Sequence, residues 1–291
     1  MRQSVQIAQR ARLLGAPVDL VTAGQVLDFV ADAVDQGRKA VVANHNLHSL
    51  HLVRTCRAMA AMYEAADLIA IDSMPLVLWG RLLGAPFSRA HRSTYLDWRD
   101  QFWATAAARR WRVFYLGAAP DVAEEAARRL AQRWPGVEIA TRHGYFDQTP
   151  GSAENRSVID EINAFRPDVL MVGMGMPLQE VWISQNFGAL RQGVVIPVGG
   201  AFDYEAGVQL AAPRLLGHMG LEWLFRLAFQ PRRLFGRYMI EPWRLVVPAV
   251  KDLSRHLMGL PVVCTERRLR HQAPCVVALA TSAGQPARLA A

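Results

Sequence analysis

Short runs of Val, Ile and Leu alternate with amphipathic segments along the first 200 or so residues of this chain. The apolar runs show little alternation of polar and apolar side chains, as expected of parallel strands that are covered on both faces. Between them, apolar residues recur at the spacing of a helix. This order predicts right-handed β-α-β crossovers and therefore an α/β fold, a mainly parallel sheet with helices on both faces.

The first clear unit of this kind begins at Thr22, which forms a capping box with Gln25, and its helix ends at Gly37. A strand follows at residues 39–43. Further along the chain, strands are expected at residues 67–72, 111–117, 137–141, 167–175 and 193–200. Helices are expected at residues 50–66, 75–84, 121–134, 157–165 and 179–190.

The pattern changes after residue 210. We expect residues 1–210 to form one α/β domain, residues 211–270 to form a basic, aromatic-rich helical appendage, and residues 271–291 to form a flexible tail. Residues 213–270 contain eleven Lys and Arg against four Asp and Glu, so they carry nearly all of the net charge of +8. A basic tail on a neutral body indicates an anionic partner, which could be nucleic acid, acidic lipid or a phosphorylated substrate.

Several classes of protein are disfavoured by the composition. No apolar run approaches the roughly 18 residues that a membrane-spanning helix needs, and the N-terminus lacks the apolar core of a signal peptide, so we expect a cytoplasmic protein. Its 3 cysteines are scattered without a CxxC pair, which fits a reducing compartment. His45, His48 and His51 would drift by about 60° per step around a helix, so no metal site is expected there.

Small and polar residues gather where the expected strands end, which is the edge at which open α/β sheets bind ligands. Asn44 and Asn46 follow one strand and are candidates for hydrogen bonding to a sugar. Glycines allow close backbone approach, and the helices that follow them favour phosphate. The predicted nucleotide-binding residues are Gly117, Gly173, Gly175, Gly199, Gly200 and Asp203. The Asp203 side chain could contact ribose hydroxyls or could cap a turn, and the sequence does not separate these two roles.

Polar side chains at two further strand ends have both a functional and a structural interpretation. Asp72 ends an apolar strand and could act as a general base, or it could cap the helix that begins near Pro75. Gln179 and Glu180 open the helix after a G-x-G turn, where they could bind a phosphate or sugar, or could only support the turn and the helix dipole.

The appendage mixes arginines with large aromatic residues, as in Arg226, Arg233, Arg237 and Tyr238. Such a segment could be an amphipathic helix pair with a solvated cationic face. It could also be an interfacial element whose arginines clamp a diphosphate. Both interpretations stay open at this point.

These pieces, in this order, resemble the WecG/TagA/CpsF family of bacterial glycosyltransferases. The resemblance runs from about Asn44 to Tyr238. Its stretches are "VVANHN", "ADLIAIDSMPLV", "HRSTYLDW", "VFYLGAAPDVAEEAA", "HGYF", "PDVLMVGMGMPLQEVWI", "VGGAFDYEAG" and "GLEWLFRLAFQPRRLFGRY".

The resemblance implies that residues 1–210 form a Rossmann-like domain which transfers a sugar from a UDP-sugar donor with inversion, without metal or other cofactor. It implies a polyprenyl-diphosphate-linked glycan as acceptor, and a protein that lies on the inner face of the cell membrane against anionic lipid. Asp72 then corresponds to the catalytic base, Asn44 to the substrate asparagine, and Arg226 and Arg233 to arginines that the appendage supplies to the site. Together with our own interpretation of the chain, the predicted substrate-binding residues are Asn44, Asn46, Arg92, Gln179, Glu180, Arg226, Arg233 and Arg237.

The variants "NHNL" and "DSMPL" look closer to the branch that resembles GumM, a β-1,4-glucosyltransferase of exopolysaccharide assembly, so we expect UDP-glucose as donor. Transfer of N-acetylmannosamine or its uronic acid is the alternative within the family. Two alternatives come from other classes, a nicotinamide-dependent oxidoreductase and a nucleic-acid binder. The first lacks the third glycine of the dinucleotide motif, and the second is disfavoured because the arginines share their stretch with many apolar residues. A homo-oligomer is left open.

Overall fold

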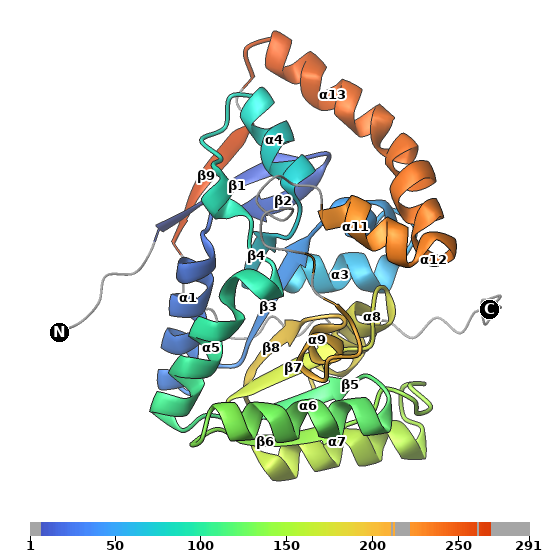
Figure 1. The fold of residues 1–291 in the computed structure, drawn as a ribbon. Helices are drawn as coiled ribbons and strands as arrows, with labels where there is room; N and C mark the ends of the chain where they lie inside the picture. The colour runs from blue at the N-terminus through green and yellow to red at the C-terminus, as the bar shows by residue number, and fades with distance from the viewer. Residues whose placement is uncertain (1–6, 211, 213–221, 261, 269–291) are drawn as a thin grey trace.

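The computed structural model describes residues 7–210, 212, 222–260 and 262–268, and contains two sheets (Figure 1). The larger sheet has six parallel strands in the order β4-β3-β8-β7-β5-β6. These strands are β3 (Ala40–His45), β4 (Leu68–Ile71), β5 (Arg112–Gly117), β6 (Glu138–Arg142), β7 (Val169–Gly173) and β8 (Val194–Pro197). The smaller, antiparallel sheet joins β2 (Ala16–Asp19), β1 (Ile7–Leu13) and β9 (Val263–Arg268).

Helices connect the parallel strands, and a helical C-terminal region follows them. Helix α1 (Ala23–Asp35) leads from β2 into β3. The connecting helices are α2 (Leu47–Leu52), α3 (Arg57–Ala65), α4 (Met74–Leu82), α5 (Tyr95–Arg109), α6 (Pro120–Arg133), α7 (Ala153–Phe165) and α8 (Leu178–Asn186), with the short 3₁₀ turn η1 (Arg89–His91). After α9 (Ala201–Glu205) come α11 (Glu222–Phe229), α12 (Pro231–Phe235), the π-helical turn η2 (Gly236–Ile240), the 3₁₀ turn η3 (Glu241–Leu245) and α13 (Val246–Leu257).

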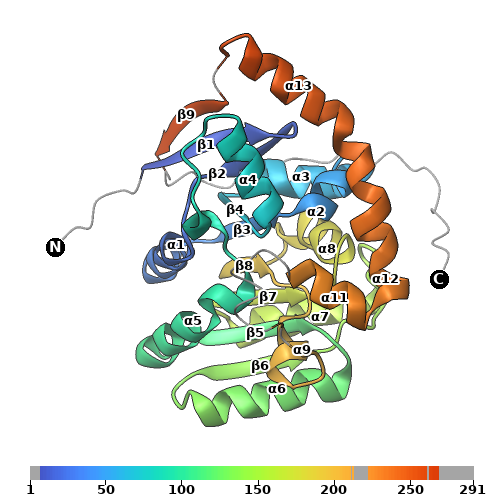
Figure 2. The ribbon, with the colours of Figure 1, turned by 45° about the horizontal axis from the view of Figure 1, so that its top comes forward.

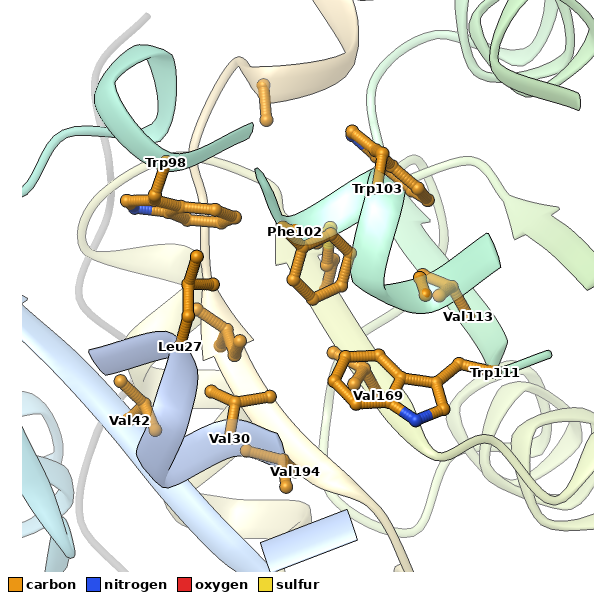
Figure 3. Close-up of a cluster of buried hydrophobic side chains, with 14 of the residues drawn as sticks. Leu27, Val30, Val42, Trp98, Phe102, Trp103, Trp111, Val113, Val169 and Val194 are labelled. Carbon is orange, nitrogen blue, oxygen red and sulfur yellow. The ribbon is translucent and has the colours of Figure 1, made fainter. Parts of the chain in front are cut away.

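Each face of the parallel sheet has its own hydrophobic core, because successive side chains of a strand point to opposite faces. On one face Val42, Val113 and Val169 pack with residues of α1 and α5, including the buried Phe102 (Figure 3). On the other face Phe114, Leu170 and Val195 pack against α3, α7 and α8. The α/β fold predicted from the alternation of elements is therefore confirmed.

The smaller sheet was not predicted. β1 and β2 form a hairpin whose two turn residues, Leu14 and Gly15, both have positive φ angles of 49° and 80°. A leucine in this backbone region is uncommon, so the pair carries no ordinary turn signal. β9 joins the hairpin from the far end of the chain by pairing antiparallel with β1. The appendage thus ends in a strand in addition to its helices.

Two helices differ from expectation. The helix expected at residues 50–66 is divided into α2 and α3, and the Thr55 hydroxyl donates a hydrogen bond to the Leu52 carbonyl at the break. Helix α5 was missed altogether, although Thr94 and Asp97 form a capping box at its start. The expected flexible tail at residues 271–291 lies outside the described residues.

The chain from α11 to α13 runs along the side of the molecule that carries α2 and α4 (Figure 2). Asp252 of α13 accepts hydrogen bonds from the Leu14 backbone N–H, at 2.6 Å, and from the Trp79 indole, at 3.2 Å. Leu245 is buried in the same core as α4. Within the described residues, no helix is long and apolar enough to cross a membrane.

Candidate active site

A pocket of about 240 Å³ opens at the carboxyl ends of β3 and β4. Its walls come from the first turns of α2 and α4, from the loop before α5, and from α11, η2 and η3 of the appendage. Residues distant in the sequence therefore meet here. The predicted site residues that line the pocket are Asn46, Asp72, Arg92, Arg226 and Arg237.

Asp72 lies directly after β4 and faces this pocket. Its backbone N–H donates to the His45 carbonyl at 2.8 Å, which continues the pairing of β3 with β4. The N-cap of α4 is Ser73, and Pro75 stands in the first turn. Asp72 therefore stands one residue before the N-cap position of α4. Its carboxylate lies at the edge where the sheet meets the pocket.

Arg92 is placed next to Asp72 by a backbone bridge. Ile71 and Arg92 pair in parallel, and the Ser93 N–H donates to the Ile71 carbonyl at 2.7 Å. The Arg92 guanidinium also contacts Asp97, with 3.4 Å between Nε and Oδ2. This loop therefore acts as a short extra strand that brings a cation to the end of β4.

Arg226 and Arg237 reach the pocket from the appendage. Burial lowers the pKa of Arg237, and the neighbouring Arg226 lowers it further, whereas the charges of Asp72 and Glu241 raise it. Arg226 donates a hydrogen bond to the Tyr204 hydroxyl and lies over that ring. Three arginines thus line the same pocket as Asp72, which suits a ligand that carries more than one negative charge.

Arg233 and Asp203 are not among the residues that line the pocket. Arg233 is exposed on α12, where its guanidinium contacts Gln230 at 3.3 Å. Burial raises the pKa of Asp203, while the charge of Arg233 lowers it, so the two side chains act on each other. The predicted roles of Arg233 and Asp203 in ligand binding stay predictions.

The two predicted asparagines have different places. Asn46 lines the pocket and caps α2, because its side chain accepts from the Ser49 N–H at 3.0 Å. Asn44 lies two residues earlier, within β3, and does not line the pocket. Its amide donates to the Pro197 carbonyl of β8 at 3.4 Å, so it joins the ends of two neighbouring strands.

Gln179 and Glu180 are buried at the start of α8 and do not line the pocket. Gln179 accepts hydrogen bonds from the backbone N–H groups of Gly175, at 3.2 Å, and Gly199, at 3.1 Å, and donates to Glu180 at 2.7 Å. It thus ties together the turns that follow β7 and β8. The N–H groups of Gly175 and Gly199 thus donate within the chain. Contact of these glycines with a nucleotide stays a prediction.

Burial raises the pKa of Glu180 to about 7. The Gln179 amide and the charge of Arg237 act in the opposite direction. Its second carboxylate oxygen has no hydrogen-bond partner among the described residues. Glu180 is therefore a buried titratable group whose pKa responds to the charge of Arg237 in the appendage.

The predicted nucleotide-binding glycines stand in a row at the strand ends, with Gly117 of β5 paired to Gly173 of β7. A side chain at Gly117, whose φ is +154°, would overlap the Gly173 backbone. A side chain at Gly173 would overlap Tyr115 and the Gly199 carbonyl. Close packing of the strand ends explains these glycines, and Gly200, which has Asp203 against it, has a similar constraint.

The three histidines face separate partners. His45 is buried, stacks on Tyr63 with ring centroids 3.9 Å apart, and contacts Ser49 at 2.9 Å. Burial lowers the pKa of His45 to about 3, so its ring is neutral at pH 7. His48 contacts Glu241 at 2.5 Å, and His51 contacts Arg244 at 3.2 Å.

These last two contacts join α2 to η3 of the appendage. In the part of the chain that the structure describes, no group of three His, Cys, Asp or Glu side chains could hold a metal ion.

Other pocket residues had no assigned role in the sequence. His48 and Thr94 line the pocket beside the predicted residues, and Trp223 and Tyr238 form an aromatic edge with ring centroids 6.1 Å apart. The mixture of arginine and aromatic residues after residue 222 was the available signal for the aromatic pair. For His48, the spacing of three histidines drew attention to a metal instead.

The chain was compared with models of protein families and with known proteins. The family model described as "Glycosyl transferase WecG/TagA/CpsF family" matches residues 11–258. Proteins named N-acetylglucosaminyldiphosphoundecaprenol N-acetyl-beta-D-mannosaminyltransferase from Staphylococcus aureus strains NCTC 8325 / PS 47, COL and MRSA252 are each 30% identical over 234 residues, which cover 79% of this chain and 88% of the relative.

These relatives bear on the expected donor sugar. Their printed names describe transfer of N-acetylmannosamine, which was the alternative within the family, and not of glucose. The expectation of a GumM-like glucosyltransferase is therefore not supported. They also favour a transferase over the oxidoreductase and the nucleic-acid binder.

Proposed function

This chain belongs to the WecG/TagA/CpsF family of glycosyltransferases, and we propose that it transfers N-acetylmannosamine from its UDP-activated form to polyprenyl-diphosphate-linked N-acetylglucosamine. The observation that carries the proposal is the pocket, where one aspartate meets three arginines from three separate parts of the chain. The reaction named for the relatives has an acceptor with a diphosphate and a hydroxyl, and the pocket offers groups for both.

Asp72 is the proposed general base. Its carboxylate accepts the proton of the acceptor hydroxyl while that oxygen forms a bond to the anomeric carbon of the donor. The bond between the anomeric carbon and the UDP phosphate oxygen breaks on the opposite face, and its electron pair leaves with UDP. This displacement inverts the anomeric centre.

The arginines are proposed to stabilise the negative charge on the two diphosphates. Arg92 comes from the body of the protein, whereas Arg226 and Arg237 come from the appendage. Fixed cations in a partly buried site stabilise a leaving diphosphate without reorganisation during the reaction. The family resemblance implies transfer without a metal, and these three guanidinium groups are the candidates for that charge.

We further propose that the protein works at the inner face of the membrane, where a polyprenyl-linked acceptor would lie. The appendage carries exposed apolar residues on α13, namely Val246, Val250 and Leu253, together with basic residues such as Lys251. An amphipathic helix with this composition suits an anionic lipid surface. A homo-oligomer remains a prediction of the sequence.

The direct test is a transfer assay with a short-chain polyprenyl-diphosphate-N-acetylglucosamine acceptor. The donors are UDP-N-acetylmannosamine, UDP-glucose and GDP-mannose, each assayed with and without EDTA. We expect transfer from UDP-N-acetylmannosamine at a rate that EDTA does not change. Preferred transfer from UDP-glucose would restore the GumM-like assignment, and loss of transfer with EDTA would contradict the metal-independent mechanism. No transfer from any donor would overturn the proposed function.

A further inference from the structure

The lining of the pocket combines charged and apolar side chains. Asp72 and the three arginines carry the charges. The apolar and aromatic members come from both the body and the appendage, namely Leu47, Met74, Pro75, Trp223, Tyr238 and Met239. A pocket of this composition fits a ligand in which a charged group is joined directly to hydrocarbon.

An apolar stripe leads out of the pocket along α4. Pro75 lines the pocket, and Leu78 and Leu82 follow at spacings of three and four residues, which places all three on one side of the helix. Leu78 is 54% exposed and Leu82 is 61% exposed. The opposite side of α4, with Leu76 and Val77, is buried in the core. Leu78 and Leu82 therefore lie outside the core cluster to which Leu76 and Val77 belong.

The stripe has the length and the position of a binding track. Pro75 and Leu82 are about 10 Å apart along the axis, because a helix rises ~1.5 Å per residue. Trp79, one position from Leu78, donates to Asp252 of α13 at 3.2 Å, so the appendage lies along one flank of α4. The track therefore begins among the pocket residues and continues beside the appendage.

We propose that the apolar residues of the pocket and the Pro75–Leu78–Leu82 stripe bind the first isoprene units of the acceptor lipid. This inference rests on the proposed function, since it takes the acceptor to be a polyprenyl diphosphate. The arginines hold the diphosphate, and the hydrocarbon joined to it must leave the pocket. The stripe begins at the pocket residue Pro75. A hydrocarbon bound along it would remove apolar surface of both the lipid and the two leucines from water.

The uracil base of the donor is the competing occupant for part of this surface. Trp223 and Tyr238 could stack against a base as well as contact an isoprene unit. Leu78 and Leu82 lie beyond the pocket lining, and a nucleotide bound at the strand ends has no need of them. Variants at these two leucines therefore separate the lipid track from a base-stacking site.

The experiment measures kcat/KM for two water-soluble acceptors, N-acetylglucosaminyl diphosphate linked to one isoprene unit or to four, without vesicles or detergent. We expect wild-type protein to prefer the longer acceptor by about tenfold or more, because more apolar surface is buried. The double variant Leu78→Gln, Leu82→Gln should reduce this ratio to within about twofold of one. Leu257→Gln, which changes a leucine that is 78% exposed in the last turn of α13, should keep the wild-type ratio.

Each result has a defined meaning. A wild-type ratio near one, or a double variant that keeps the wild-type ratio, would overturn the lipid track while transfer itself still supports the proposed function. A loss of preference in Leu257→Gln equal to that of the double variant would also overturn it, because the effect would then be general to exposed apolar surface. Absence of transfer to both acceptors would overturn both proposals. Melting temperatures confirm folding, and the single variants Leu78→Gln and Leu82→Gln replace the double variant if it is unstable.

Discussion

The position of Asp72 is determined by backbone hydrogen bonds that join the end of β4 to β3 on one edge and to the loop at Arg92 on the other. The chain before it belongs to β4, its own N–H is bonded to His45, and Arg92 is paired to the preceding residue, Ile71. An aspartate held in this way cannot move far from the pocket, while its charge is felt by Arg237. Such a residue can accept a proton from a ligand that the arginines have oriented.

Asp72→Asn is therefore expected to lower kcat by about 10³-fold, within the range of ~10²–10⁴ typical of a general base. The amide keeps the size of the side chain, so UDP binding measured by calorimetry should change by less than about threefold. Asp121→Asn, at an exposed position in the first turn of α6, is the matched control and should keep wild-type turnover. Near-normal turnover in Asp72→Asn would show that another group takes the proton.

At the scale of elements, the first turn of α8 holds the strand ends together. Gln179 bridges the turns after β7 and β8, and Glu180 is buried behind it with a raised pKa. The glycines of the adjacent strands let the backbones approach closely. These residues fix the turns after β7 and β8 through contacts within the chain.

The buried Glu180 should make stability depend on pH. Its folded-state pKa of about 7 lies above its ordinary value of 4.5, so the folded protein keeps this proton while the unfolded chain loses it. The stabilisation is present below about pH 4.5 and is lost as pH rises through about 7. Between these limits, wild-type protein should lose about 3 kcal/mol of unfolding free energy relative to Glu180→Gln.

Denaturant unfolding of wild type and Glu180→Gln at pH 5 and pH 8 measures this difference. Glu64→Gln, at an exposed position of α3, serves as the control and should follow the wild type at both values. If Glu180→Gln also follows the wild type, then Glu180 is ionised in the folded protein and the assignment of a neutral carboxyl is incorrect.

At the scale of the whole molecule, the pocket exists only because the appendage is attached to the body. His48 contacts Glu241, His51 contacts Arg244, and β9 adds a strand to the hairpin of β1 and β2. Asp252 adds a fourth connection by accepting from the body at two points. Arg226 and Arg237 therefore reach the pocket only while these contacts hold the appendage on the body.

Asp252→Ala should loosen this attachment. It leaves the Leu14 N–H and the Trp79 indole without their partner, which costs about 1–3 kcal/mol for a buried donor. We expect a lower melting temperature and faster limited proteolysis between residues 222 and 260. Asp160→Ala, at an exposed position on α7, should change neither quantity. Unchanged melting and cleavage in Asp252→Ala would show that β9 and the histidine contacts are sufficient.

The elements predicted from the sequence were those with strong local patterns. The apolar runs became β3 to β8, and the capping box of Thr22 and Gln25 starts α1 as expected. The hairpin turn at Leu14 and the pairing of β9 were missed. The turn depends on an unusual backbone conformation at Leu14, and β9 pairs with a strand from the other end of the chain. Neither feature produces a periodic pattern in the sequence.

For the candidate site, the sequence by itself determined the strand ends, and with them the positions of Asn46 and Asp72 at one edge of the sheet. Which predicted residues meet was decided by the tertiary structure, which brought Arg226 and Arg237 to Asp72 but took Gln179 into contacts between strands. The physical reason is the distance along the sequence over which each kind of interaction acts. Periodicity and capping arise from neighbours within a few residues, whereas the partner of a side chain depends on how elements far apart in the sequence pack.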